Sequence, residues 1–188
     1  MKMFAVVALL QLCLIGNVFA GKIRHASVQY SEGVFSVEFD ALVSAEQPEI
    51  YTLLTDYDHF FRLNDIIVES AVINKQSDLV KKYRLLLQAC ILFFCRDVVL
   101  IEDVQENGRD EVIAVVDPVL SNFSSGRSIW KILPAGAGQT SIMLRRKLEP
   151  SFWIPPLIGP WVMKNKMLQE LSVMLTRLEQ YASDQSGT

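Results

Sequence analysis

The chain has 188 residues, a formal net charge of −3 at neutral pH and a hydrophobic content of 51%. This length corresponds to one domain, which is large enough to enclose a core and a cavity. The charge is slightly acidic and the sequence contains no run of lysine and arginine, so we expect no nucleic acid as a partner.

Residues 1–20 are predicted to be a signal peptide. Lys2 gives a short positive start, residues 3–18 are mostly apolar, and the small residues at positions 18 and 20 fit a cleavage before Gly21. We therefore expect export, to the periplasm of a bacterium. An uncleaved N-terminal anchor is the alternative, although the apolar stretch is short for a membrane span.

The first predicted strand spans residues 33–43, in which apolar and polar residues alternate. Such a strand is buried on one face only. Ser44 and Pro48 indicate the start of a short helix, and residues 56–63 are predicted to form a second one. His25 precedes the first strand, in a segment that we expect to be mobile.

Six further strands are predicted to form an up-and-down meander: 66–73, 79–89, 95–104, 111–117, 127–133 and 140–148. The connections around them alternate between polar and apolar sequences. Every second connection of a meander lies at the same end of the sheet, so the apolar connections 90–95, 117–125 and 149–161 should gather there. Loops are normally solvated, so an apolar end needs a hydrophobic ligand or a membrane to cover it.

Cys90 and Cys95 flank the tip of a predicted hairpin, where side chains lie opposite each other. A cross-strand disulfide is geometrically feasible there, and export would place it in an oxidising compartment. Two free buried thiols and a metal site that lacks its other ligands are the alternatives. A disulfide would hold this apolar tip in one shape.

A long helix is predicted from Gly159 to Ala182, because apolar residues recur there at helical spacing. Such a helix is about 35 Å long and presents one continuous apolar stripe. Residues 183–188 are predicted to be a disordered tail, so the folded domain would span residues 21–182.

The order of these elements resembles that of the START-like (SRPBCC) superfamily, in its polyketide cyclase/dehydrase and coenzyme-Q-binding branch. The residues that carry the resemblance are spread over the chain after the signal peptide: Tyr51–Tyr57, Leu63, Ile67–Ile73, Gly126, Trp130, Pro134, Gly138, Thr140, Pro150, Pro155 and Pro156. The resemblance implies an α+β helix-grip fold. In that fold a curved seven-stranded antiparallel sheet wraps a long C-terminal helix, and two short helices lie between strands one and two.

The resemblance also implies a hydrophobic cavity between the sheet and the long helix. Members of this branch are associated with the binding of isoprenoid quinones, lipids and polyketides. The signal peptide and the cysteine pair depart from the intracellular members of the branch, and they favour a location in the cell envelope.

We expect the cavity and its mouth to be lined by residues of the sheet, the apolar connections and the helix: Phe35, Val37, Phe39, Tyr83, Leu85, Leu87, Phe93, Phe94, Phe123, Trp130, Ile142, Leu144, Arg146, Trp153, Trp161, Met167 and Leu171. Arg146 would bind a carbonyl, carboxylate or head group, or else pair with Glu149 as a charge on the rim. Tyr83 would offer a hydroxyl group to the cavity, or else belong to the core. Trp161 is expected to pack between the helix and the sheet.

The sequence contains no HExxH or GxSxG segment and no cluster with the spacing of metal ligands. His25 and His59 are interpreted as surface residues. We therefore predict no catalytic residue, no metal and no cofactor.

The function that the sequence predicts is an exported, non-enzymatic binding protein or carrier for a lipid, an isoprenoid quinone or a similar molecule. Its apolar loops would touch a membrane surface transiently. One alternative is a cyclase-like or hydratase-like enzyme in which Tyr83 and Arg146 act as acid and oxyanion stabiliser. Another is an envelope interaction module that docks onto a second protein through Phe93 and Phe94.

Overall fold

The computed structural model describes residues 21–91 and 94–186. The predicted signal peptide, Phe93 and the last two residues of the predicted tail lie outside this range. The elements follow each other as β1 (Lys22–Ser31), β2 (Val34–Val43), α1 (Gln47–Thr55), the 3-10 helix η1 (Phe60–Leu63), β3 (Ile67–Lys75), β4 (Val80–Ile91), β5 (Phe94–Asn107), β6 (Glu111–Val116), β7 (Phe123–Gly136), β8 (Gln139–Pro150) and α2 (Gly159–Ser186).

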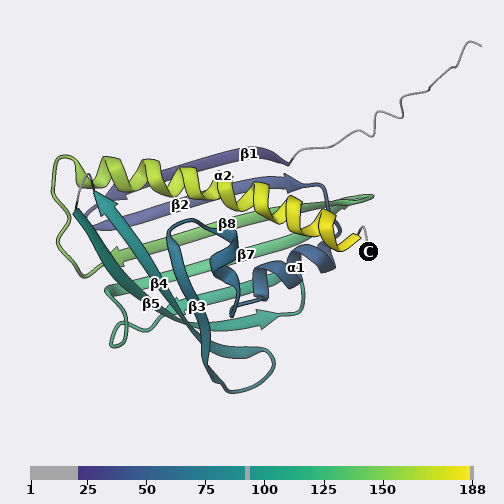
Figure 1. Cartoon of the computed structure of the whole chain (residues 1–188), viewed down its shortest axis with the longest axis horizontal. Helices are drawn as coiled ribbons and strands as arrows, with labels where there is room; N and C mark the ends of the chain where they lie inside the picture. The colour runs from purple at the N-terminus through teal and green to yellow at the C-terminus, as the bar shows by residue number, and fades with distance from the viewer. Residues whose placement is uncertain (1–20, 92–93, 187–188) are drawn as a thin grey trace, which may run out of the picture.

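Within the described residues, the strands form one eight-stranded sheet in the order β1-β2-β8-β7-β6-β5-β4-β3. All neighbours are antiparallel. Figure 1 shows how the sheet curves: β2, β8 and β7 run beside α2, whereas β3, β4 and β5 cross at a steep angle. The α+β helix-grip architecture is thus confirmed, with one strand more than the seven that we predicted.

The additional strand is β1, and the prediction missed it because its side chains do not alternate. Of its ten residues only Val28 is buried, as expected for the edge of a sheet. A two-residue turn joins it to β2, with positive φ angles at Glu32 and Gly33. His25 lies within this strand, next to Asp40 of β2, and not in a mobile segment.

The short helices begin later than predicted. The N-cap of α1 is Glu46, whose capping box with Glu49 fixes the first turn. Ser44 instead donates its backbone N–H to the Glu179 carboxylate of α2, at 3.1 Å. Residues 56–59 form a turn, and only Phe60–Leu63 is helical. These contacts tie the first half of the domain to the C-terminal helix.

Helix α2 lies on the concave face of the sheet, and its apolar stripe forms the centre of the main core. The stripe includes Leu171, Met174, Leu175 and Leu178, which pack against β2, β8 and α1. The helix continues to Ser186, beyond its predicted end at residue 182. Among the described residues, no helix is long and apolar enough to cross a membrane.

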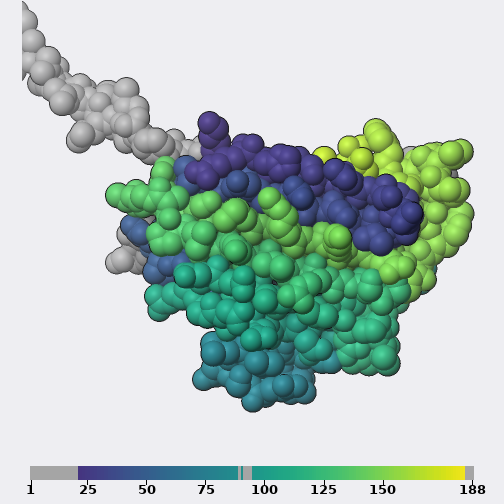
Figure 2. Space-filling model, turned by 180° about the vertical axis from the view of Figure 1, so that it is seen from behind, coloured from purple at the N-terminus to yellow at the C-terminus, as the bar shows by residue number. Residues whose placement is uncertain are grey.

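A second hydrophobic cluster lies beneath β4, β5, β6 and β7, around Tyr83, Leu85 and Val98. Figure 2 shows the outer face of the sheet, where the strands follow each other in bands from β1 downwards. At one edge the β8–α2 connection and the first turns of α2 project beyond these bands. The candidate site lies at this overhanging end.

Candidate hydrophobic ligand site

A cavity of about 830 Å³ lies where the first turns of α2, the β8–α2 connection and the β4–β5 hairpin meet. Most of its wall is apolar, and the residues responsible are Ile66, Cys90, Val98, Phe152, Trp153, Pro155, Ile158, Val162, Met163 and Met167. Four polar or charged residues complete the lining: Asp65, Gln88, Arg96 and Lys166. A volume of roughly 300–1,000 Å³ is typical of sites for small molecules.

Hydrogen bonds join two of the apolar connections to each other and to β5 at this end of the sheet. The Asn122 side chain, in the β6–β7 connection, accepts the Val99 N–H of β5 at 2.8 Å. The Asn122 carbonyl accepts the Ser151 N–H of the β8–α2 connection at 3.1 Å. The edge-to-face contact of Phe123 with Phe152 adds an apolar link. The expected gathering of the apolar connections is therefore present in the structure.

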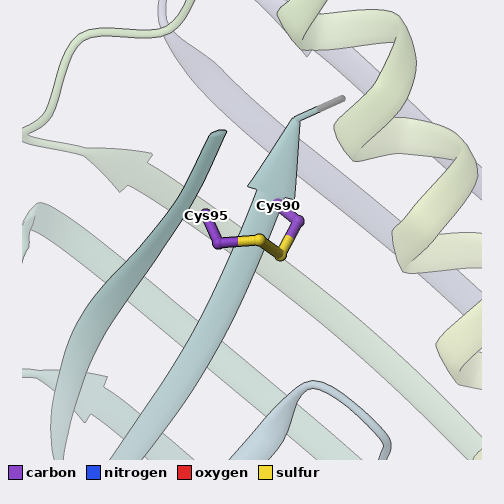
Figure 3. Close-up of a disulfide and its surroundings, with 2 residues drawn as sticks. All are labelled: Cys90 and Cys95. Atoms are coloured by element: carbon purple, nitrogen blue, oxygen red, sulfur yellow. A yellow bond between two sulfur atoms is a disulfide. The ribbon is translucent and has the colours of Figure 1, made fainter. Parts of the chain in front are cut away.

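A disulfide joins Cys90 and Cys95 at the ends of β4 and β5. Figure 3 shows the two side chains reaching across from neighbouring strands. The structure thus selects the first of the three alternatives for this cysteine pair. Because Cys90 also lines the cavity, the cross-link fixes the pair of strands that carries one of its walls.

The start of α2 lies very close to the preceding β8–α2 connection, and Gly159 makes this close packing possible. A Cβ atom on Gly159 would lie 2.4 Å from Cγ2 of Ile154, too close for any side chain. The glycine therefore lets the β8–α2 connection fold back against the first turn of the helix. The backbone N–H of Gly159 donates to the carbonyl of Pro155 at 2.9 Å, which closes this turn.

The rim around the cavity exposes several large apolar side chains. Trp153 is 77% exposed and Trp161 is 67% exposed, and the others are Val119, Leu120, Leu157 and Ile158. The expectation that Trp161 packs between helix and sheet is wrong, because the first turn of α2 overhangs the sheet. We refer to these six residues as the apolar rim.

One ion pair and one hydrogen bond attach α2 to the segment that precedes β3. Asp65 pairs with Arg177, and its backbone N–H donates to the buried carboxylate of Glu170 at 2.8 Å. Lys166 Nζ lies 2.6 Å from the same carboxylate. Asp65 and Lys166 of the cavity wall are therefore both neutralised by residues of α2.

The sequence matches no family model and no curated protein. Solved structures do match. A START superfamily protein from Mycobacterium smegmatis is 18% identical with a TM-score of 0.61, and the match covers 80% of this chain and 98% of that one. The fold is START-like.

Two further START-like neighbours differ in what their names state. The Zhui aromatase/cyclase from Streptomyces sp. R1128 is 10% identical, with a TM-score of 0.64 and coverage of 81% of this chain and 96% of that chain. A STAR-related lipid transfer protein from Xanthomonas axonopodis is 16% identical, with a TM-score of 0.59 and coverage of 84% and 98%. At these identities the likeness establishes the START-like fold alone.

Within the part of the chain that the structure describes, two of the residues expected around the START-like cavity, Trp153 and Met167, line it. Six others are packed in the main core: Phe35, Val37, Phe39, Ile142, Leu144 and Leu171. Five belong to the second cluster or pack against it: Tyr83, Leu85, Leu87, Phe123 and Trp130. Helices α1 and α2 fill the concave face of the sheet along most of its length, so the open space is left at the apolar end.

The remaining expected residues lie elsewhere. Phe93 is outside the described residues, and Phe94 is the first residue of β5. Sequence reasoning missed Ile66, at the start of a predicted strand, and Val162 and Met163, near the start of the predicted long helix. The predicted apolar connection 149–161 contains Phe152, and this was the clearest signal in the sequence for the part of the cavity wall that the β8–α2 connection forms.

Tyr83 and Arg146, the two polar residues expected in the cavity, meet at the buried carboxylate of Glu102. The Tyr83 hydroxyl donates to Glu102, and Nη2 of Arg146 donates to its Oε1 at 2.9 Å. Burial, and then the charge of Glu102, raise the pKa of Tyr83 well above its ordinary value. Glu149, the partner considered for Arg146, instead accepts a hydrogen bond from Ser125 at 2.8 Å.

Proposed function

We propose that the protein binds one molecule of a hydrophobic ligand, such as a lipid or an isoprenoid quinone, and acts as a non-enzymatic carrier outside the cytoplasm. The observation that carries the proposal is the cavity of about 830 Å³ with a mainly apolar wall. Water in such a space gains few hydrogen bonds, so an apolar molecule that displaces it is favoured.

The START-like neighbours support binding of this class, since one of them is named as a lipid transfer protein. Two others are named as aromatase/cyclases. For this chain, the residues considered for such chemistry, Tyr83 and Arg146, are engaged with Glu102 and are not part of the cavity wall. This arrangement favours a carrier over an enzyme that uses these two groups.

Export rests on two features of the chain. Residues 1–20 have the pattern of a signal peptide. The disulfide between Cys90 and Cys95 is a bond that persists in oxidising compartments such as the periplasm. Together they support a location outside the cytoplasm.

The apolar rim supports a further part of the proposal, which is that the protein collects its ligand at a bilayer surface. Trp153 and Trp161 stand exposed beside the cavity, and tryptophan is enriched where proteins meet the interface of a membrane. Loading at the bilayer would let the ligand pass between membrane and cavity without crossing bulk water.

The test is to extract lipids from the purified protein and then to titrate the lipid-free protein with ubiquinone and with a phospholipid. We expect one ligand per chain. Val162→Trp places an indole into the cavity and should weaken binding by at least about tenfold. Val162 lines the cavity but does not pack against either core, so the fold should persist.

Leu157→Trp is the matched control, because Leu157 is 92% exposed and does not line the cavity. It should bind the ligand as the unmodified protein does. A protein that yields no lipid and binds neither ubiquinone nor phospholipid would contradict the proposal. Equal binding by the Val162→Trp variant would place the ligand outside this cavity.

A further inference from the structure

We infer that the ligand carries a single anionic head group and that Arg96 binds it, an inference that rests on the proposed hydrophobic-ligand site. Arg96 is one of four polar or charged residues in the wall of the cavity. The inference follows from where its side chain lies and from how the other charges of the wall are balanced.

Arg96 continues the inward-facing row of β5. Side chains of a strand alternate between its two faces, and Val98 and Leu100, at the next two positions of the same face, are each 2% exposed. The guanidinium group of Arg96 lies 5.5 Å from the centre of the Phe152 ring, which is also part of the cavity wall. Arg96 is itself exposed to solvent, so its cationic group lies against an aromatic ring at the open side of the cavity.

The cross-strand pairs next to Arg96 hold it in place. Arg96 pairs with Ala89 of β4, and the adjacent pair is Cys90 with Cys95. The disulfide closes that adjacent pair. A guanidinium group whose strand is cross-linked and which lies beside a ring loses less conformational entropy when a ligand binds.

The charges of the wall leave one cation without a partner. Asp65 is neutralised by Arg177, and Lys166 by Glu170, while Gln88 is neutral. Among the described residues, no carboxylate lies within ion-pair distance of Arg96. The cavity therefore presents one uncompensated positive charge to an otherwise apolar volume.

A neutral ligand would cover the apolar wall but would leave the solvent-exposed guanidinium group of Arg96 without a counter-charge, so it would use only part of the site. An amphiphile with a carboxylate or a phosphate head would satisfy both parts of the site. Each of these anions accepts two parallel hydrogen bonds from a guanidinium group. Fatty acids and lysophosphatidic acid are the two sources of this chemistry.

The experiment compares cis-parinaric acid with its methyl ester, which have the same chain and differ in head-group charge. Binding to the purified, lipid-free protein is followed by the fluorescence of the polyene chain. We expect the acid to bind on the order of tenfold more tightly than the ester, as for a hydrogen bond to a charged group. Displacement by oleate and by 1-oleoyl-lysophosphatidic acid then separates carboxylate from phosphate.

Arg96→Gln should abolish the preference by weakening the acid to the level of the ester, with little effect on the ester. Arg127→Gln is the matched control, because Arg127 is an exposed arginine of β7 that does not line the cavity. Arg96→Lys keeps the charge without the planar fork and should retain part of the preference. Thermal unfolding followed by circular dichroism checks that each variant is folded.

Equal affinity of the unmodified protein for acid and ester would overturn the role of Arg96 and leave the proposed function intact. A preference for the acid that survives in Arg96→Gln would also overturn the role of Arg96 and leave the proposed function intact. Failure of the unmodified protein to bind the acid, the ester, ubiquinone and phospholipid would instead remove the proposed function itself. A variant that fails to fold does not affect the comparison of acid and ester in the unmodified protein.

Discussion

Two of the buried carboxylates of this domain lie on one strand, β5. On β5 the inward-facing row contains Glu102 and Glu106, which are 1% and 5% exposed, between apolar neighbours such as Val104. Glu102 accepts from Tyr83 and Arg146, and Glu106 lies 2.6 Å from the Nζ of Lys81. Buried carboxylates are tolerated when they are paired in this way.

Glu102→Gln should destabilise the domain by about 3 kcal/mol, because it leaves the guanidinium group of Arg146 partly buried without its counter-charge. The double variant Glu102→Gln/Arg146→Met should be more stable than the single one. Urea unfolding measures both free energies. The control is Glu69→Gln, since Glu69 forms an exposed pair with Arg84, and it should change stability by less than about 1 kcal/mol. A Glu102→Gln variant as stable as this control would show that the buried pair is energetically neutral.

At the scale of elements, periodicity predicted most of the fold. The alternation in β2 and the helical spacing in α2 each reflect one buried face, so both elements were found. The edge strand β1 has no such signal, because most of its residues are exposed. Pairing order and curvature are not encoded in local periodicity, and for them the resemblance to START-like proteins was decisive.

The candidate site was only partly predictable. The alternation of connections between the two ends of the sheet indicated which of them gather at one end, and Asn122 links two of them, the β6–β7 and β8–α2 connections. This alternation could not show how far α1 and α2 fill the concave face, so residues such as Phe39 and Leu144, both in the main core, were expected in the cavity. The inward row of β5 was also unassigned, because Ile101 on its other face is buried as well, and Arg96 was therefore missed.

The apolar rim allows a prediction about its loops. Leu157→Ser/Trp161→Ser should reduce binding to phosphatidylglycerol vesicles on the order of tenfold or more, since each side chain contributes roughly 1.5–3 kcal/mol when it leaves water. Neither residue lines the cavity, so the affinity for ligand in solution should not change. Vesicle sedimentation measures the first quantity, and fluorescence titration measures the second.

The control for this prediction is Ile73→Ser/Leu79→Ser. These residues are 46% and 53% exposed and lie in and after β3, away from the apolar connections. Both are exposed apolar side chains, although less surface is removed than with Leu157 and Trp161, which are 92% and 67% exposed. If both double variants bind vesicles equally well, the rim is not the surface that meets the membrane.

At the scale of the whole molecule, one end of the domain is closed and the other is open. The closed half is held by the main core and by the contact of Ser44 with Glu179. Three tyrosines, Tyr51, Tyr57 and Tyr83, belong to the second hydrophobic cluster or pack against it. Tyr51 and Tyr83 donate to the buried carboxylates Glu106 and Glu102, and Tyr57 packs against Tyr83 at a ring distance of 5.0 Å.

Because the pKa values of these three phenols are raised in the folded state, we expect the domain to lose stability at alkaline pH. Burial and the hydrogen bond to Glu106 raise the pKa of Tyr51 to about 12, from 10.0 in the unfolded chain. Burial raises the pKa of Tyr57, and the charge of Glu106 raises it further. Burial likewise raises the pKa of Tyr83, and the charge of Glu102 raises it further. A raised pKa means that the folded state retains protons that the unfolded state releases. The stabilisation is therefore complete below pH 10 and is lost as the pH rises above it.

The free energy of unfolding should thus show no pH dependence from these phenols between pH 7 and 9, and should fall above pH 10. The slope approaches about 1.4 kcal/mol per pH unit for each fully buried phenol. Tyr83→Phe should reduce this slope, because the variant lacks the phenol proton of Tyr83 that the unfolded state releases. Tyr30→Phe removes a hydroxyl from an exposed residue of β1 and serves as the control. Urea unfolding from pH 7 to 11.5 measures the slopes, and parallel curves for the two variants would show that the buried phenol does not control alkaline stability.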